Sequence, residues 1–137
     1  MVRLAQSKKR TNSNAILADR AHSHIEVARA EATLRSARAF YFQAIAEAWE
    51  VAEAGAKVSI EQRRDIRLAT THAVEASIKT VDAMYTLGGG GAVYAESPLQ
   101  RHFRDVHMTS QHIMVAPSTL ETVGRLYLGV EARTATL

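Results

Sequence analysis

Cysteine is absent from this chain of 137 residues, and proline and aromatic residues are scarce. Without cysteine there is no disulfide framework and no thiolate chemistry, which fits a reducing compartment such as the cytoplasm. Two prolines and 6% aromatic residues, beside abundant alanine, glutamate, arginine and leucine, favour helix over sheet. The apolar runs are far shorter than a membrane span. We therefore expect a cytoplasmic, all-α protein of one domain that makes no membrane contact.

The net charge of +3 is small, and its distribution argues against binding of nucleic acid. A basic run from Lys8 to Arg10 lies in a polar segment, and we expect residues 1–14 to form a flexible leader before a helical domain over residues 15–137. A nucleic-acid binder would gather its basic residues on one face. Here arginines alternate with acidic residues, as on solvated helix faces: Arg29, Arg35, Arg38, Arg63, Arg64 and Arg67 beside Glu26, Glu31, Glu61 and Asp65.

Apolar residues at steps of three or four predict a first helix of roughly forty residues that ends at Gly55. Its expected inner stripe comprises Leu17, Ala21, Ile25, Ala28, Ala32, Ala39, Phe42, Ala46 and Trp49. The segment from Ser59 to Gln62 has the Ser-x-x-Gln form of a capping box. It predicts the start of a second helix, which runs to the glycines after Leu87.

Two further helices are predicted after those glycines. Ser97-Pro98-Leu99-Gln100 repeats the start signal, with proline at the first helical position. We expect the third helix to run until Ala116-Pro117 interrupts it, and Ser118 to open a shorter fourth helix. The expected inner face of the third helix comprises Leu99, Phe103, Val106, Ser110 and Ile113. Because no segment has the pattern of a strand, the expected architecture is an antiparallel helical bundle.

Four consecutive glycines, Gly88 to Gly91, join the second and third expected helices. Glycine adopts positive φ readily, and without a Cβ it lets a partner approach the backbone closely. Such a run can simply terminate a helix, or its exposed amides can form a cradle for a phosphate. The residues alone leave both interpretations open.

A set of residues that begins at this run follows an ordered pattern: Leu87 to Gly91, Tyr94, Pro98, Arg101 and the triplet Phe103-Arg104-Asp105. In order and spacing they resemble the C-terminal helical domain of the acyl-CoA dehydrogenase superfamily, and the likeness extends from about Leu17 to the end of the chain. The resemblance implies a bundle that lacks the first helix of that domain. It also implies a role in a flavin-dependent oxidoreductase and assembly into a homodimer or homotetramer.

Within that superfamily, the dehydrogenases carry a catalytic glutamate shortly beyond the Arg-Asp pair. The corresponding stretch here, residues 111–117, contains no carboxylate, which excludes dehydrogenation by that glutamate. His112 stands in this stretch, and Arg104 to His107 followed by His112 is similar to the flavin-dependent monooxygenase branch. Enzymes of that branch take reduced flavin from a separate reductase and hydroxylate aromatic or sulfur compounds. A dehydrogenase with its base elsewhere is an alternative.

The resemblance implies that His112 is the catalytic residue, since an imidazole exchanges protons near neutral pH. It also implies that Gly88, Gly89, Gly90 and Gly91 approach the FAD or FMN of a neighbouring subunit. On residues alone, a lone histidine on a helix is more often structural. His102, His107 and His112 recur every five residues, so on a helix they cannot share a face, and we expect no metal site. Arg104 and Asp105 diverge in the same way, and we expect each to pair with another helix.

Enzymes of this superfamily also use an N-terminal helical domain and a β-domain to enclose the flavin. We therefore expect the isolated chain to be inactive without those domains. An uncovered apolar face that includes Ile25, Ala32, Phe42, Ile45 and Trp49 would favour self-association. A non-enzymatic helical oligomerisation module is the alternative from a different functional class.

Overall fold

The computed structural model describes residues 5, 6, 16–135 and 137, and these residues form helices with no strand. In chain order the elements are η1 (Leu17–Asp19), α2 (Ala21–Glu53), α3 (Ile60–Gly88), η2 (Gly89–Ala92), α4 (Pro98–Thr109), η3 (Ile113–Val115) and α5 (Ser118–Tyr127). The predicted all-α fold is confirmed. The expected leader lies outside the described residues, apart from the helical Ala5 and Gln6. None of the described helices has the length and apolar character needed to cross a membrane.

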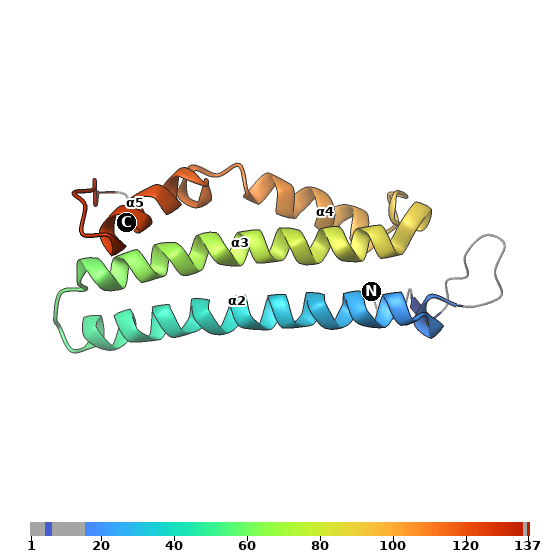
Figure 1. Cartoon of the computed structure of the whole chain (residues 1–137), viewed down its shortest axis with the longest axis horizontal. Helices are drawn as coiled ribbons and strands as arrows, with labels where there is room; N and C mark the ends of the chain where they lie inside the picture. Colours follow the sequence, from blue (N-terminus) through green and yellow to red (C-terminus); the bar gives the residue numbers. More distant parts are fainter. Residues whose placement is uncertain (1–4, 7–15, 136) are drawn as a thin grey trace.

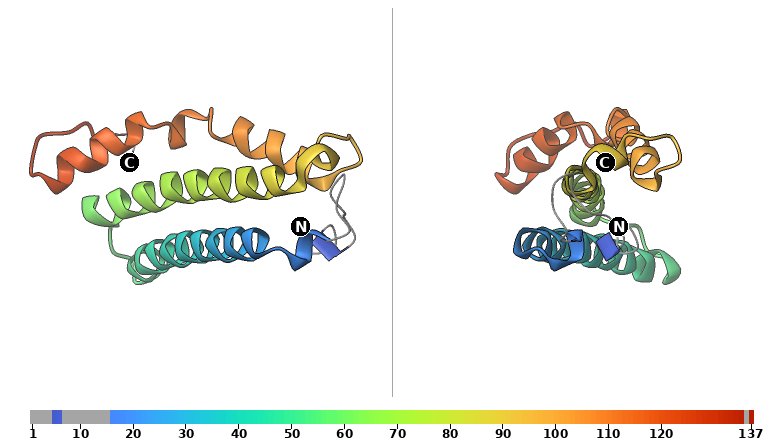
Figure 2. Two further views of the ribbon diagram at one scale, coloured as in Figure 1. Left: turned by 45° about the vertical axis from the view of Figure 1, so that its right-hand side comes forward. Right: turned by 90° about the vertical axis from the view of Figure 1, so that its right-hand side faces the viewer.

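Helix α3 is the central element of the molecule (Figure 1). Helix α2 runs antiparallel to it on one side, while α4 and α5 run back along its opposite side (Figure 2). The extensive contacts between α-helices all involve α3 within the described part of the chain. The predicted antiparallel arrangement is therefore confirmed, but as three layers in which α2 is covered on one side only.

Helix α2 packs on α3 through small residues. Ser23, Ala30, Ala37 and Ala44 are buried and recur every seven positions, as in the seam of a coiled coil. Small side chains let the two helix axes approach closely. The predicted inner stripe is wrong for α2, because Phe42 is 52% exposed and the other predicted members on this helix are exposed as well. Alanines lie on every side of this helix, so packing against α3 selects the buried face.

The ends of α2 follow from local backbone geometry. Arg20 has an extended backbone, with φ −99° and ψ 127°, so the helix begins at Ala21 and not at Leu17 as predicted. At the other end Gly55 has φ +73°, a conformation that glycine adopts at low cost. The amide of Ala56 donates to the carbonyl of Val51 across this turn, which completes a Schellman motif. The predicted stop at Gly55 is confirmed.

The three predicted helix starts after Gly55 all occur, but only the start of α3 uses a side-chain cap. Ser59 and Gln62 form the reciprocal hydrogen bonds of a capping box at the start of α3. Helix α4 begins at Pro98 as expected, although the Ser97 side chain makes no capping bond. Helix α4 also ends earlier than predicted, at Thr109. Consequently Ile113 is 76% exposed and does not belong to an inner face.

A hydrophobic cluster packs at the end of the molecule where α3 meets the glycine run. Its buried members are Ala30 of α2, Met84 of α3, Ala92 of η2 and Leu99 of α4, and Leu87 packs against them. Burial of these apolar groups stabilises the contacts of the glycine segment with three helices. The turn that carries Gly88 to Gly91 is thus held by buried residues on both of its sides.

Candidate functional site

His112 lies in a turn between α4 and α5 and not on a helix, in contrast to the prediction. The amide of His112 donates to the carbonyl of Thr109, and His112 then serves as the N-cap of η3. Its Nδ1 accepts a hydrogen bond from the amide of Met114 at 3.2 Å. The side chain is exposed. An exposed imidazole with one engaged nitrogen keeps Nε2 for proton exchange.

Two polar contacts tie this turn to α3. The Arg67 guanidinium donates from Nη1 to the carbonyl of Met114 at 2.6 Å. Five positions farther along, Thr119 and the fully buried Thr71 share a hydroxyl-to-hydroxyl bond of 2.9 Å. Arg67 is only 8% exposed, so its prediction as part of a solvated face is wrong. The turn that carries His112 is therefore anchored from the middle layer of the fold.

The four glycines differ in their surroundings. Gly88 is buried at the end of α3, and Gly89 has φ 52° and ψ −153°, a conformation that is essentially restricted to glycine. Gly90 lies in η2 and is exposed, and a Cβ there would stand more than 4 Å from any residue beyond its neighbours. Folding accounts for glycine at position 89 but not at position 90. The exposed backbone at Gly89 and Gly90 is open to an approach from outside.

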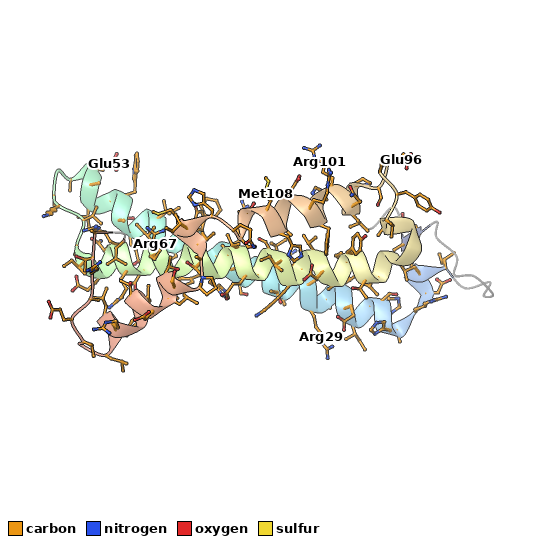
Figure 3. The ribbon with its side chains drawn as sticks, turned by 90° about the horizontal axis from the view of Figure 1, so that it is seen from above. Arg29, Glu53, Arg67, Glu96, Arg101 and Met108 are labelled. Carbon is orange, nitrogen blue, oxygen red and sulfur yellow. The ribbon has the colours of Figure 1, made fainter. Side chains whose placement is uncertain are left out.

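His112 and the glycine turn lie far apart in one chain. Arg67, which anchors the His112 turn, precedes Gly88 by 21 positions of α3. At a rise of 1.5 Å per residue, this separation is about 30 Å along the helix. Figure 3 shows Arg67 well away from Glu96, which follows the glycine turn. Within one chain, the predicted site residues thus lie in two separate regions.

A histidine-carboxylate pair that sequence reasoning missed joins α4 to α3. His107 Nε2 lies 2.9 Å from Asp82 Oδ1, and the His107 ring packs 4.5 Å from the Phe103 ring. Phe103 in turn lies 4.5 Å from Tyr85 of α3. The two residues of the pair are 25 positions apart, and only the packing of the helices brings them together. Because both side chains are more than 40% exposed, the pair contributes little to stability.

Asp105, one of the two residues of the Arg-Asp pair that contributed to the family resemblance, forms an ion pair within its own helix. Asp105 pairs with Arg101 on its own helix at 3.4 Å, and both side chains are exposed. The prediction that Asp105 pairs with another helix is therefore wrong. The i to i+4 spacing places the two side chains next to each other on the surface of α4.

A second cluster fixes α5 to α3. Arg64 makes a bidentate pair with Asp65, at 2.8 and 3.1 Å, and the Tyr127 hydroxyl donates to Asp65 at 2.9 Å. The Arg64 guanidinium lies 4.0 Å from the centre of the Tyr127 ring. Hydrogen bonding to Arg64, and then to Tyr127, lowers the pKa of Asp65. Burial, followed by the bond to Asp65, raises the pKa of Tyr127.

A groove of about 330 Å³ runs between α2, α3 and α4. Its lining comprises Tyr41, Thr70, Ala73, Val74, Ser77, Val106 and Thr109. Thr70, Ser77 and Thr109 each donate to a carbonyl four positions earlier on their own helix. With these hydroxyls satisfied, the groove offers an apolar surface and few polar contacts. Among the described residues, no three His, Asp or Glu side chains gather closely enough to bind a metal ion.

Comparison with known proteins identifies a family model and relatives that match this chain. The family model "Acyl-CoA dehydrogenase, C-terminal domain" matches residues 1–117. The chain is 37% identical over 113 residues to an indole-3-acetate monooxygenase of Pseudomonas putida, across 82% of this chain and 29% of that protein. It is 30% identical over 129 residues to an indole-3-acetate monooxygenase of Acinetobacter baumannii, across 94% of this chain and 33% of that protein.

The fold has a counterpart among solved structures. It is similar to the HsaA monooxygenase from M. tuberculosis, with a TM-score of 0.81 over 88% of this chain and 32% of that chain. With 22% sequence identity, this likeness shows the fold alone. The chain spans about a third of the length of the relatives that it matches. Because the family model matches most of its length, this chain belongs to the acyl-CoA dehydrogenase C-terminal domain family.

Proposed function

We propose that this chain provides the C-terminal helical region of a flavin-dependent monooxygenase, in which His112 is the acid-base residue. The named relatives that match most of the chain at 30–37% identity are both monooxygenases. The observation that carries the proposal is the geometry of His112. Its ring is exposed, its Nδ1 is held by the Met114 amide, and its turn is anchored to α3.

The chemistry of this residue follows from its hydrogen bond. Because Nδ1 accepts from a backbone amide, the proton of the neutral ring sits on Nε2. His112 then donates a hydrogen bond from Nε2 to a substrate or cofactor oxygen. After Nε2 has given up its proton, the same nitrogen can accept another one. A bound reduced flavin would supply the two electrons that activate dioxygen for hydroxylation.

The glycine turn fits the approach of a flavin cofactor. Gly90 is exposed and has no side chain, and no packing among the described residues accounts for glycine at this position. The open space at Gly90 would let a phosphate group of FAD or FMN approach the backbone of the turn closely. Since the turn lies about 30 Å from the anchor of the His112 turn, we assign the two regions to the flavins of different subunits.

This assignment requires an oligomer, and the uncovered side of α2 offers the surface for one. An outer α2 stripe of Val27, Leu34, Phe42 and Trp49 is 40–65% exposed. Large apolar groups in such number seldom remain exposed on a monomer. We propose that a homodimer or homotetramer covers this stripe, and that a separate reductase supplies the reduced flavin.

Complementation tests the proposed function. The Pseudomonas putida relative, truncated before its matching segment, is mixed with this chain, flavin and a flavin reductase, and hydroxylation of indole-3-acetate is followed. We expect hydroxylation to return with the wild-type chain and to fall at least about 100-fold with His112→Ala, the range of a lost acid-base group. His102→Ala, an exposed histidine on α4, is the control and retains activity.

Flavin binding separates an enzyme component from a module that only oligomerises. The complemented assembly is purified and its absorbance is measured after gel filtration with FAD or with FMN. Co-elution of either flavin supports the proposal, and the preferred flavin identifies the cofactor. An assembly that forms but stays colourless, without hydroxylation, favours the non-enzymatic helical module.

A further inference from the structure

The turn that carries His112 is held by a buried cation from another helix. Arg67 of α3 is 8% exposed, and its Nη1 donates to the Met114 carbonyl at 2.6 Å across 47 positions of sequence. A short hydrogen bond from a charged donor is stronger than one between neutral groups.

Met114 connects this anchor to the imidazole. Its carbonyl accepts from Arg67, and its amide donates to His112 Nδ1. With both backbone groups engaged, rotation of the Met114 peptide units would break one bond or the other. The orientation of the donor that faces His112 is therefore set through the bond from Arg67, a residue of another helix.

We propose that Arg67 is a positioning residue that fixes the tautomer and ring orientation of His112 through Met114. Without the anchor, the short η3 turn relaxes, the Met114 amide turns away, and either ring nitrogen of His112 can carry the proton. The arrangement thus leaves the Nε2–H group of His112 available to donate a hydrogen bond or a proton. Its relevance to catalysis rests on the function proposed above for His112.

Nuclear magnetic resonance of the full chain tests this inference without any measurement of turnover. In ¹⁵N-labelled protein at a pH where the rings are neutral, long-range ¹H–¹⁵N spectra report the tautomer of each histidine. We expect His112 in a single Nε2–H form, with a scalar coupling between its Nδ1 and the Met114 amide nitrogen. A wild-type His112 that populates both tautomers would overturn the proposal.

Arg67→Met removes the donor but keeps an extended apolar stem in the buried position. We expect loss of the coupling, a mixture of His112 tautomers and faster hydrogen exchange at Met114. His102 and His107 lie on α4 and should be unchanged, which distinguishes release of the turn from general unfolding. Arg67→Lys keeps a charged donor and should restore the single tautomer. A folded Arg67→Met protein with His112 unchanged would overturn the proposal.

Arg67→Gln, which is neutral and too short to reach Met114, replaces the methionine variant if that protein does not fold. Failure of both variants to fold would also overturn the proposal, because Arg67 would then hold the whole fold and not this turn. The proposed function fails separately, if His112→Ala leaves the complemented hydroxylation intact while the tautomer behaves as expected. The two outcomes are therefore distinguishable.

Discussion

The packing of α2 on α3 through small residues predicts a sharp contrast between two neighbouring alanines. Ala37 is 2% exposed at this contact, whereas Ala39 lies on the outer side of the same helix. Ala37→Leu replaces a methyl by an isobutyl group where no space exists, and overpacking of this kind costs about 1–3 kcal/mol. Leucine and alanine have similar helix propensities, so little of this cost is offset locally. For a chain of this size, the expected loss corresponds to a melting temperature lower by roughly 4–12 °C.

Ala39→Leu makes the same chemical change and should alter the free energy of unfolding by less than about 0.5 kcal/mol. Urea unfolding followed by circular dichroism, at matched protein concentration, compares the two variants with the wild type. Equal m-values would show that the surface exposed on unfolding is unchanged. Because Ala39 belongs to the stripe that periodicity predicts to be buried, the pair tests the observed face against the predicted one. A larger loss for Ala39→Leu than for Ala37→Leu would refute the packing described here.

Three further predictions concern the turn, the α5 cluster and the oligomer. Gly89→Ala should cost about 1–3 kcal/mol in urea unfolding because of its backbone conformation, whereas Gly90→Ala should cost less than about 0.5 kcal/mol; the reverse order would contradict the turn geometry. Asp65 has a lowered pKa in the folded protein, so its contribution to stability is complete above the ordinary carboxyl pKa and is lost as the pH falls through the lowered value. Tyr127→Phe should therefore cost about 1 kcal/mol at neutral pH and less in acid, while Tyr94→Phe, an exposed control, should show no such trend. In sedimentation at micromolar concentration, Trp49→Glu should shift the oligomer toward monomer, and Leu128→Glu, 81% exposed on the opposite layer, should not; equal effects would argue against the outer α2 stripe as the interface.

The parts of the fold that sequence predicts well are those set by local chemistry. The Ser59 capping box, Pro98 at the start of α4 and the positive φ of Gly55 each depend on residues within one turn of the helix end. The buried face of α2 depends instead on a long-range contact. Ala37 and Ala39 are indistinguishable by hydrophobicity, and only the close approach of α3 decides which of them is buried.

The candidate site likewise has features that the sequence predicts and features that depend on long-range contacts. His112 and the glycine run were predicted from a family resemblance, and their roles stay predictions. The position of His112 in a turn could not be predicted, because a continued helical pattern through Ile113 is compatible with the same residues. Arg67 was missed because an arginine among charged neighbours resembles a solvated residue. Its partner, the Met114 carbonyl, becomes visible only when α3 and η3 are placed together.

Two groups of residues in this structure differ in their surroundings: one group is engaged within the chain, and the other faces outward. This contrast supports the proposed assembly. Arg67 and Thr71 face inward, and their polar atoms engage the segment that follows α4. Gly90 and Trp49 face outward, and nothing within the described chain accounts for the missing side chain of one or the exposed bulk of the other. If a single chain were the working unit, the outward residues would be free to vary in size and polarity without loss of function. The proposal requires the opposite, since a Cβ at Gly90 would impede the cofactor and a charge at Trp49 would impede the neighbouring subunit.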